Sequence, residues 1–206
     1  MGNVRAWRGH VLERGLTQRS GDYASPVPAI VIPYRGDAKR RLPSSVRAAV
    51  AVAMLGDVVE AALQVGRVFV VTDDAAVVPV GAEVVPDPGG GLGAAVVAGL
   101  ARVEGHALVV NADLPAATPS ALRRLAGAGL ALVEAADGTT NALSLPDPSV
   151  FAPAYGPRSA DRFRAHAPFA TVSIPELEWD VDSDADLERL AARVGPRTRA
   201  LLAVPA

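Results

Sequence analysis

The strongest constraint in this sequence is a regular alternation of short apolar runs with longer segments of helical spacing. Within residues 44–64, Val46, Val50, Met54 and Val58 recur at intervals that place them on one face of a helix. Several of the short runs, such as AIVI and ALVV, are apolar at consecutive positions, as in strands that are covered on both faces. The pattern predicts an α/β fold of three layers, in which helices cover both sides of a mostly parallel sheet.

The expected elements follow from these runs and from the turn residues between them. We expect strands at 28–33, 67–74, the start of 82–91, 106–110, 129–137 and 170–182. We expect helices at 44–64, 92–103, 118–127, 159–167 and 183–195. Thr118 and Pro119 are residue types that begin a helix, and Ser183 or Asp184 is the expected cap of the last helix.

The length and composition fit one domain. With 206 residues, 50% of them hydrophobic, the chain can bury a single sizeable core, and we assign this domain to residues 26–206. Residues 1–25 lack the apolar stretch of a signal peptide, so we expect a leader outside the domain. A net charge of −2 and the lack of any apolar run of roughly 20 residues argue against nucleic acid and membrane as partners. The chain has no cysteine, so it forms no disulfides, and without a signal-peptide stretch we expect a cytoplasmic protein.

Charged residues gather after the expected strands, whereas the turns before the strands, such as those at Gly66 and Gly105, show no such gathering. The residues after the strands are Arg35, Lys39, Asp73, Asp74, Asp113, Asp180 and Asp182. In open parallel sheets, ligands bind outside the carboxyl ends of the strands. The asymmetry therefore predicts a binding site at that edge.

Three of these acids have the chemistry of a metal site. Asp180 and Asp182 stand at alternating positions, so in an extended chain they point the same way, toward the edge where Asp113 ends its strand. Carboxylate oxygens suit Mg²⁺, which completes its shell with water and phosphates. The simpler interpretations also stand at this point: Asp113 as a turn residue, and the other two as helix caps. The coincidence of both groups at one edge favours the metal site.

The same edge carries groups that suit phosphate. Of the 20 basic residues, Lys39 is the one lysine, and it lies in a loop with Arg35 and Arg40. Lysine is a common partner of phosphate, although a solvated basic loop is the simpler interpretation. The GGGLG stretch at 89–93 can bring backbone close to a base or a phosphate, but a flexible turn has the same composition.

Several motifs, in one order along residues 28–192, resemble a known family. They are AKRRL, VVTDD, NADLP, GTTNAL, YGPRS and WDVDSDADL. Together they resemble the phospholactate and phosphoenolpyruvate guanylyltransferases of coenzyme F-420 biosynthesis. The resemblance implies the three-layer fold of the nucleotide-diphospho-sugar transferases, which is called GT-A-like.

The resemblance also implies a reaction and its partners. GTP, Mg²⁺ and a small phosphorylated acid would bind, the acid being 2-phospho-L-lactate, phosphoenolpyruvate or 3-phosphoglycerate. The phosphate of the acid would attack the α-phosphorus of GTP, and pyrophosphate would leave. The product would pass to a transferase that acts on the deazaflavin precursor. Which acid is accepted, whether GTP is preferred over other nucleotides, and whether the chain forms a homodimer stay open.

Site residues are carried over from the matching motifs. Lys39 and Asp113 would be catalytic, with Asp180 and Asp182 completing the metal site around Asp113. Contacts to the acid would come from Asn141, Gly156 and Ser159, and contacts to the nucleotide from Arg35, Lys39, Thr72, Asp73, Gly91 and Gly93. Amide, N–H and hydroxyl donors suit a carboxylate or phosphate. Ser159 could instead simply cap a helix.

Two other functions stay open on the sequence. The first is another nucleotidyltransferase of the same fold, acting on molybdopterin or a sugar phosphate, although such enzymes usually have a longer glycine-rich first loop. The second is a non-catalytic nucleotide-binding protein. The sequence also departs from the family pattern, because Gly93 stands where asparagine is common and Asn111 where some relatives carry a second acid.

Overall fold

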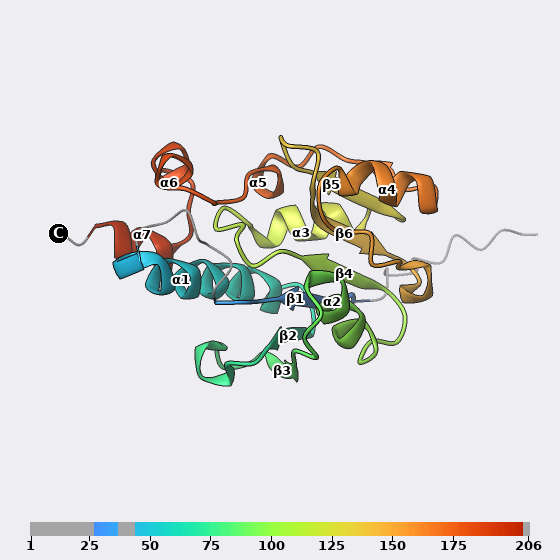
Figure 1. Ribbon diagram of the computed structural model, residues 1–206, viewed down its shortest axis with the longest axis horizontal. Helices are drawn as coiled ribbons and strands as arrows, with labels where there is room; N and C mark the ends of the chain where they lie inside the picture. Colours follow the sequence, from blue (N-terminus) through green and yellow to red (C-terminus); the bar gives the residue numbers. More distant parts are fainter. Residues whose placement is uncertain (1–26, 37–43, 204–206) are drawn as a thin grey trace, which may run out of the picture.

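The computed structural model of the chain describes residues 27–36 and 44–203 (Figure 1). Lys39, Arg40 and the leader expected at 1–25 lie outside the described residues. The described part contains one seven-stranded sheet in the order β3-β2-β1-β4-β6-β5-β7. Its strands are β1 (Ala29–Pro33), β2 (Val68–Thr72), β3 (Glu83–Pro86), β4 (Ala107–Val110), β5 (Ala131–Glu134), β6 (Thr140–Leu145) and β7 (Ala170–Thr171).

The sheet is parallel except at one strand. β1 pairs with β2 and β4 in parallel, with Val31 opposite both Phe69 and Val109, and β2 pairs with β3 in the same sense. β6 runs antiparallel to both of its neighbours, β4 and β5. The carboxyl ends of β1 to β4 therefore meet at one edge, as the predicted mostly parallel sheet requires.

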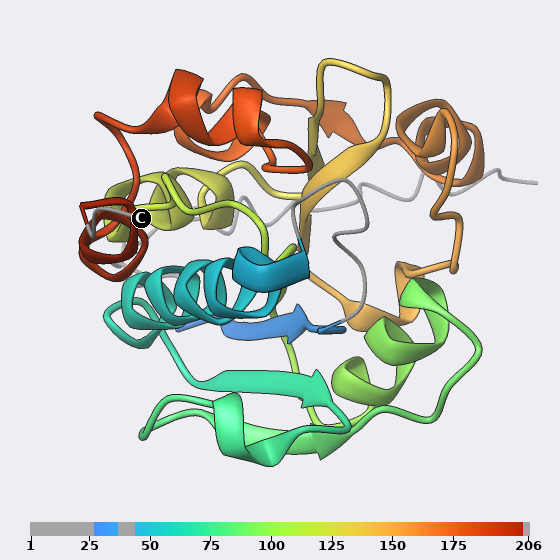
Figure 2. The ribbon, with the colours of Figure 1, turned by 60° about the vertical axis from the view of Figure 1, so that its left-hand side comes forward.

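Helices cover both faces of the sheet, as Figure 2 shows for α1 and α2 on opposite sides of β1. One face packs against α1 (Ser44–Leu63), α3 (Pro119–Ala126) and α5 (Pro175–Glu178), and the other against α2 (Leu92–Leu100) and α4 (Ser159–His166). The remaining helices are α6 (Asp184–Leu190) and α7 (Pro196–Leu202), with single turns η1 (Ala75–Val77) and η2 (Pro148–Val150). The three-layer prediction is confirmed.

Alternate residues of the central strands enter different cores. Ile30 and Ile32 of β1 pack toward α1, whereas Val31 between them packs toward α2, and all three are fully buried. This explains why the strands are apolar at consecutive positions. None of the helices in the described part of the chain combines the length and apolar character needed to cross a bilayer.

Local signals placed several elements correctly. Thr118 caps α3 by accepting a hydrogen bond from the N–H of Ala121 over 3.1 Å, with Pro119 as the first helical residue. Ser183 is the cap of α6, and its hydroxyl and the Asp186 carboxylate form a reciprocal capping box.

Other expectations were wrong. The strand predicted at 170–182 is only two residues long as β7, because Pro175 starts a helical turn and residues 179–182 join no strand ladder. The last four residues of the GTTNAL motif, which was not predicted as a strand, form the first part of β6. The last predicted helix ends at Leu190, and Pro196 begins the separate helix α7.

Candidate active site

The three predicted metal ligands come together in the structure. One carboxylate oxygen from each of Asp113, Asp180 and Asp182 lies within 4.8 Å of the others. A backbone hydrogen bond explains the convergence, because the N–H of Val181 donates to the carbonyl of Asp113 over 3.1 Å. Val181 is fully buried in a core cluster with Met54 of α1. This burial fixes the position of the backbone between Asp180 and Asp182. The arrangement offers three hard oxygen atoms to one cation.

The segment after these acids is held by the start of α6. The Asp186 carboxylate accepts hydrogen bonds from the N–H groups of Asp182 and Ser183, over 3.1 and 2.9 Å, and from the Ser183 hydroxyl. Burial raises the pKa of Asp186, but these hydrogen bonds and Arg189 outweigh it, so that the pKa lies below the ordinary value. The carboxylate that orients Asp182 is therefore ionised at neutral pH.

A buried aspartate attaches the C-terminal helix to α1. Asp57 is 4% exposed and accepts hydrogen bonds from the N–H groups of Arg197 and Thr198, each over 2.9 Å. At the same end of α7, the N–H of Gly195 donates to the carbonyl of Pro115 over 2.7 Å. The carbonyl of Pro115 thus joins the C-terminal segment to the chain that follows Asp113.

A cavity of about 270 Å³ opens beside Asp113. Its lining comes from the ends of β1 and β4 and from α1 and α2, and comprises Pro33, Tyr34, Arg35, Ala51, Met54, Leu92, Ala95, Asn111, Ala112 and Asp113. Burial, and then the charge of Asp74, raise the pKa of Tyr34, so its phenol stays a hydrogen-bond donor at neutral pH. Asp113, an expected metal ligand, and Arg35, which was expected at the nucleotide, thus line the same cavity.

Asp87, which the sequence analysis did not single out, organises the neighbouring loops. Its carboxylate is 5% exposed and accepts hydrogen bonds from Arg35 Nε over 3.0 Å and from the N–H of Gly89 over 2.9 Å. Its own N–H donates to the carbonyl of Thr72 over 3.2 Å. Asp87 follows β3 as Asp73 follows β2. Because ligands bind outside the carboxyl ends of parallel strands, a search for charged residues after the third strand would have identified Asp87.

The residues after β2 mostly bond within their own loop. Thr72 is buried, and its hydroxyl accepts a hydrogen bond from the N–H of Asp74 over 3.1 Å. Asp74 caps η1, whereas Asp73 is exposed and lines a hollow of about 520 Å³ together with Tyr34 and Arg35. The expected contacts of Thr72 and Asp73 with the nucleotide stay predictions.

The glycine-rich turn needs its glycines. Gly89, Gly90 and Gly91 all have positive φ, a conformation that other residues adopt only with strain. A Cβ on Gly93 would lie 2.7 Å from the Cβ of Pro153, so the start of α2 packs directly on the loop before α4. Gly93 and Gly156 line one hollow of about 930 Å³, which brings a residue expected at the nucleotide close to one expected at the acid.

The other two residues expected at the acid are buried and bonded within the protein. The side-chain amide of Asn141 donates to the carbonyl of Leu177 over 3.1 Å, which fixes α5 on β6. The Ser159 hydroxyl donates to the Thr140 hydroxyl oxygen over 3.1 Å. In the structure both therefore hold elements together, and their contact with the acid stays a prediction.

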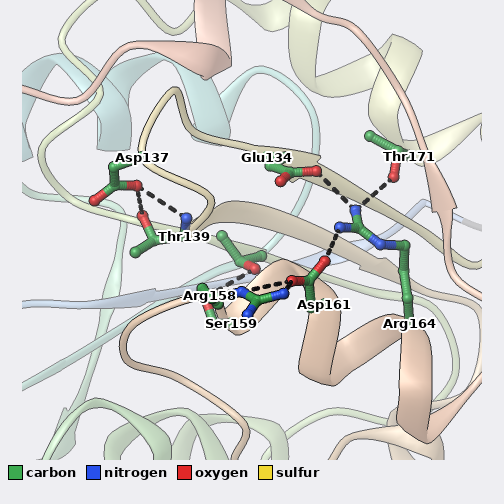
Figure 3. Close-up of polar contacts among 9 residues, drawn as sticks. Glu134, Asp137, Thr139, Arg158, Ser159, Asp161, Arg164 and Thr171 are labelled. Carbon is green, nitrogen blue, oxygen red and sulfur yellow. Dashed lines mark hydrogen bonds and ion pairs between the residues drawn. The ribbon is translucent and has the colours of Figure 1, made fainter.

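A charged cluster holds α4 in place (Figure 3). Arg164 donates to Glu134 of β5 over 2.7 Å, to Thr171 of β7 over 3.0 Å, and to Asp161 over 2.7 Å. Arg158 also donates to Asp161. Hydrogen bonds from Arg164, then from Arg158, hold the pKa of Asp161 below its ordinary value. The cluster fixes the helix that starts at Ser159.

Comparison with known proteins identifies the family. The family model of the MobA-like NTP transferase domain matches residues 46–165. A phosphoenolpyruvate guanylyltransferase from Streptomyces coelicolor is 37% identical over 201 residues, covering 84% of this chain and 95% of the relative. One from Geodermatophilus obscurus is 41% identical over 165 residues, covering 73% and 77%. The chain belongs to the phosphoenolpyruvate guanylyltransferase family.

Membership in this family agrees with the fold. A crystal structure from Desulfovibrio desulfuricans, ascribed to a nucleotide-diphospho-sugar transferase, superposes with a TM-score of 0.62 at 18% identity, covering 85% of this chain and 93% of that one. The MobA-like match includes Asp113 but ends before Asp180 and Asp182. Two of the three converging carboxylates thus lie beyond the part of the chain that matches the wider domain family.

Proposed function

We propose that this chain transfers the guanylyl group of GTP to the phosphate of phosphoenolpyruvate, with release of pyrophosphate, in the biosynthesis of coenzyme F-420. The convergence of Asp113, Asp180 and Asp182 beside a cavity at the carboxyl edge carries the proposal. The names of the relatives support GTP and phosphoenolpyruvate as the two substrates.

The chemistry needs little acid–base help from the protein. A phosphate oxygen of the acid bonds to the α-phosphorus of GTP, while the bond from that phosphorus to the bridging oxygen of the β-phosphate breaks. The attacking phosphate is already ionised near neutral pH, so positioning and neutralisation of charge are the main tasks. This fits an edge that carries carboxylates and basic residues but, in the described part, no histidine beside Asp113.

The three carboxylates would hold Mg²⁺. Oxygen donors from Asp113, Asp180 and Asp182 within 4.8 Å of one another suit a small hard cation, and few protein ligands leave room for phosphate. When bound, the ion supplies positive charge to the phosphates of the reaction. Arg35, now bonded to Asp87, would turn to the departing pyrophosphate together with Lys39. Those two residues would stabilise the negative charge that develops as the bond breaks.

The acid would bind on the side of the edge toward α4. Gly156 has φ of +112° and is exposed, in the turn before Ser159. The hollow that Gly156 shares with Gly93 would bring acid and nucleotide to neighbouring positions. Asn141 and Ser159 would act at the acid through a change in their present hydrogen bonds. The product would then pass to the transferase that acts on the deazaflavin precursor.

The test is release of pyrophosphate from GTP and Mg²⁺. Phosphoenolpyruvate, 2-phospho-L-lactate and 3-phosphoglycerate are supplied separately, and ATP and CTP replace GTP in parallel reactions. We expect release with GTP and phosphoenolpyruvate above all other pairs. Release with another acid would correct the substrate, and no release with any pair would reject the guanylyltransferase function.

A further inference from the structure

Asn111 carries a buried acceptor that the protein leaves unused. Its side-chain oxygen Oδ1 is shielded from solvent and accepts no hydrogen bond from any residue in the described part of the chain. A buried polar atom without a partner is uncommon, because burial removes its hydrogen bonds to water without replacement. In a residue that lines the cavity beside Asp113, such an atom points to a ligand.

The orientation of the amide is fixed by its surroundings. Nδ2 of Asn111 donates to the carbonyl of Thr140 over 3.2 Å, and the backbone N–H donates to the carbonyl of Asn141 over 3.0 Å. The reverse orientation would set Oδ1 against the Thr140 carbonyl, acceptor against acceptor. The hydrogen bond from Nδ2 thus holds the side chain in place, and Oδ1 is left without a partner among the described residues.

The neighbourhood limits what the ligand group can be. Asn111 and Asp113 stand two residues apart where β4 ends, and both line the cavity, so the ligand group lies close to the expected metal. A phosphate has no donor to offer at neutral pH. The donors close to the metal end of a bound nucleotide are O–H groups, from water on the ion or from the sugar.

We propose that Asn111 Oδ1 accepts a hydrogen bond from an O–H group of the bound metal–nucleotide complex. The inference rests on the proposed function, and makes Asn111 a binding residue beside the metal ligands. Oδ1 of the amide would accept the hydrogen bond from the ligand, while Nδ2 donates to the Thr140 carbonyl and so connects the end of β4 to β6.

The experiment compares one variant with a matched control. Asn111→Leu removes the acceptor with little change of volume. Thr198→Val is the control, because Thr198 Oγ1 is also buried without a hydrogen bond in the described residues but lies on α7. Calorimetry on the full chain measures binding of Mn²⁺ alone, and of GTP and 3′-deoxy-GTP with Mn²⁺, so turnover is not needed.

We expect Asn111→Leu to weaken binding about threefold to tenfold, as for loss of one hydrogen bond, and Thr198→Val to bind as tightly as the wild type. Weaker binding of Mn²⁺ alone identifies water on the ion as the donor. Unchanged Mn²⁺ binding, weaker GTP binding and equal binding of 3′-deoxy-GTP to both proteins identify the sugar hydroxyl.

The proposal is overturned if Asn111→Leu binds every probe as Thr198→Val does, in which case the acceptor is only an internal feature. Failure of the proposed function is a separate result. An Asn111→Leu effect on Mn²⁺ or GTP binding without pyrophosphate release from any acid would reject the reaction and leave the role of Asn111 intact. A wild-type chain that binds neither Mn²⁺ nor GTP would reject both.

Discussion

Two clusters of charged side chains in this protein are built in opposite ways. Around Asp113, carboxylates from two distant segments of the chain approach one another. Around α4, the carboxylates of Glu134 and Asp161 lie on either side of the guanidinium of Arg164, so opposite charges alternate (Figure 3). The first arrangement is a set of oxygen donors for a cation, and the second is a tie between a helix and the edge of the sheet.

Because of this difference, we expect mutations in the two clusters to affect different properties of the protein. Changes in the carboxylate cluster should lower metal binding and turnover while the fold persists, because its acids are at the surface edge. Changes in the α4 cluster should lower the stability of the fold first.

Asp182→Ala should have the largest effect. Loss of one metal ligand removes part of several kcal/mol of charge stabilisation, so turnover should fall at least about a hundredfold. Asp184→Ala is the matched control, since Asp184 is an exposed acid two residues further on, outside the cluster. Steady-state pyrophosphate release measures both, with circular dichroism as a check of the fold. An Asp182→Ala variant as active as Asp184→Ala would remove Asp182 from the metal site.

Mn²⁺ or Mg²⁺ should stabilise the wild-type protein against heat. At a concentration 100 times the dissociation constant, binding to the folded state adds about 2.7 kcal/mol, and the melting temperature should rise by several degrees. In Asp113→Asn the rise should be mostly lost, because one of the three converging carboxylates is gone. Differential scanning calorimetry with and without the ion measures it. An equal rise in both proteins would mean that the ion binds elsewhere.

Arg164→Gln should mainly lower stability. The side chain is 31% exposed, so loss of its ion pairs with Glu134 and Asp161 should cost about 1 kcal/mol, or about 2–4 °C in melting temperature. We expect turnover within about twofold of the wild type. Arg193→Gln, at an exposed position, is the control and should change neither quantity. A large loss of turnover with unchanged stability would show that the α4 cluster acts in the reaction.

The smallest effect concerns pH and the capping box of α6. The pKa of Asp186 lies below its ordinary value of 3.8, so the ionised form stabilises the folded state. This stability is fully present above the unfolded pKa and is lost as the pH falls through the lower, folded pKa. The difference in unfolding free energy between wild type and Asp186→Asn should therefore be constant from pH 5 to 7 and shrink below about pH 4. Urea titrations at each pH measure it, and a constant difference down to pH 2 would contradict the assignment.

Local patterns predicted those features that depend on neighbours in sequence. The apolar runs became β1, β2, β3, β4 and β5, and Thr118 and Ser183 cap the helices that they were expected to cap. The strand predicted at 170–182 was wrong beyond Thr171, because alternating residue types do not show whether a segment has a partner strand. β6 was missed because it begins with two polar residues, Thr140 and Asn141. Both are buried and form hydrogen bonds, and a search for runs of apolar residues does not detect such a strand.

The sequence by itself determined the fold class, the edge that carries the charges, and the three acids that belong together. Only the tertiary structure decided how they meet: the Val181 N–H bonds to the Asp113 carbonyl, Asp87 joins Arg35 to the glycine-rich turn, and the Asn111 amide faces Thr140. The physical reason is range. Periodicity and capping report contacts within a few residues, whereas these bonds join segments whose approach depends on the packing of the whole sheet and its helices.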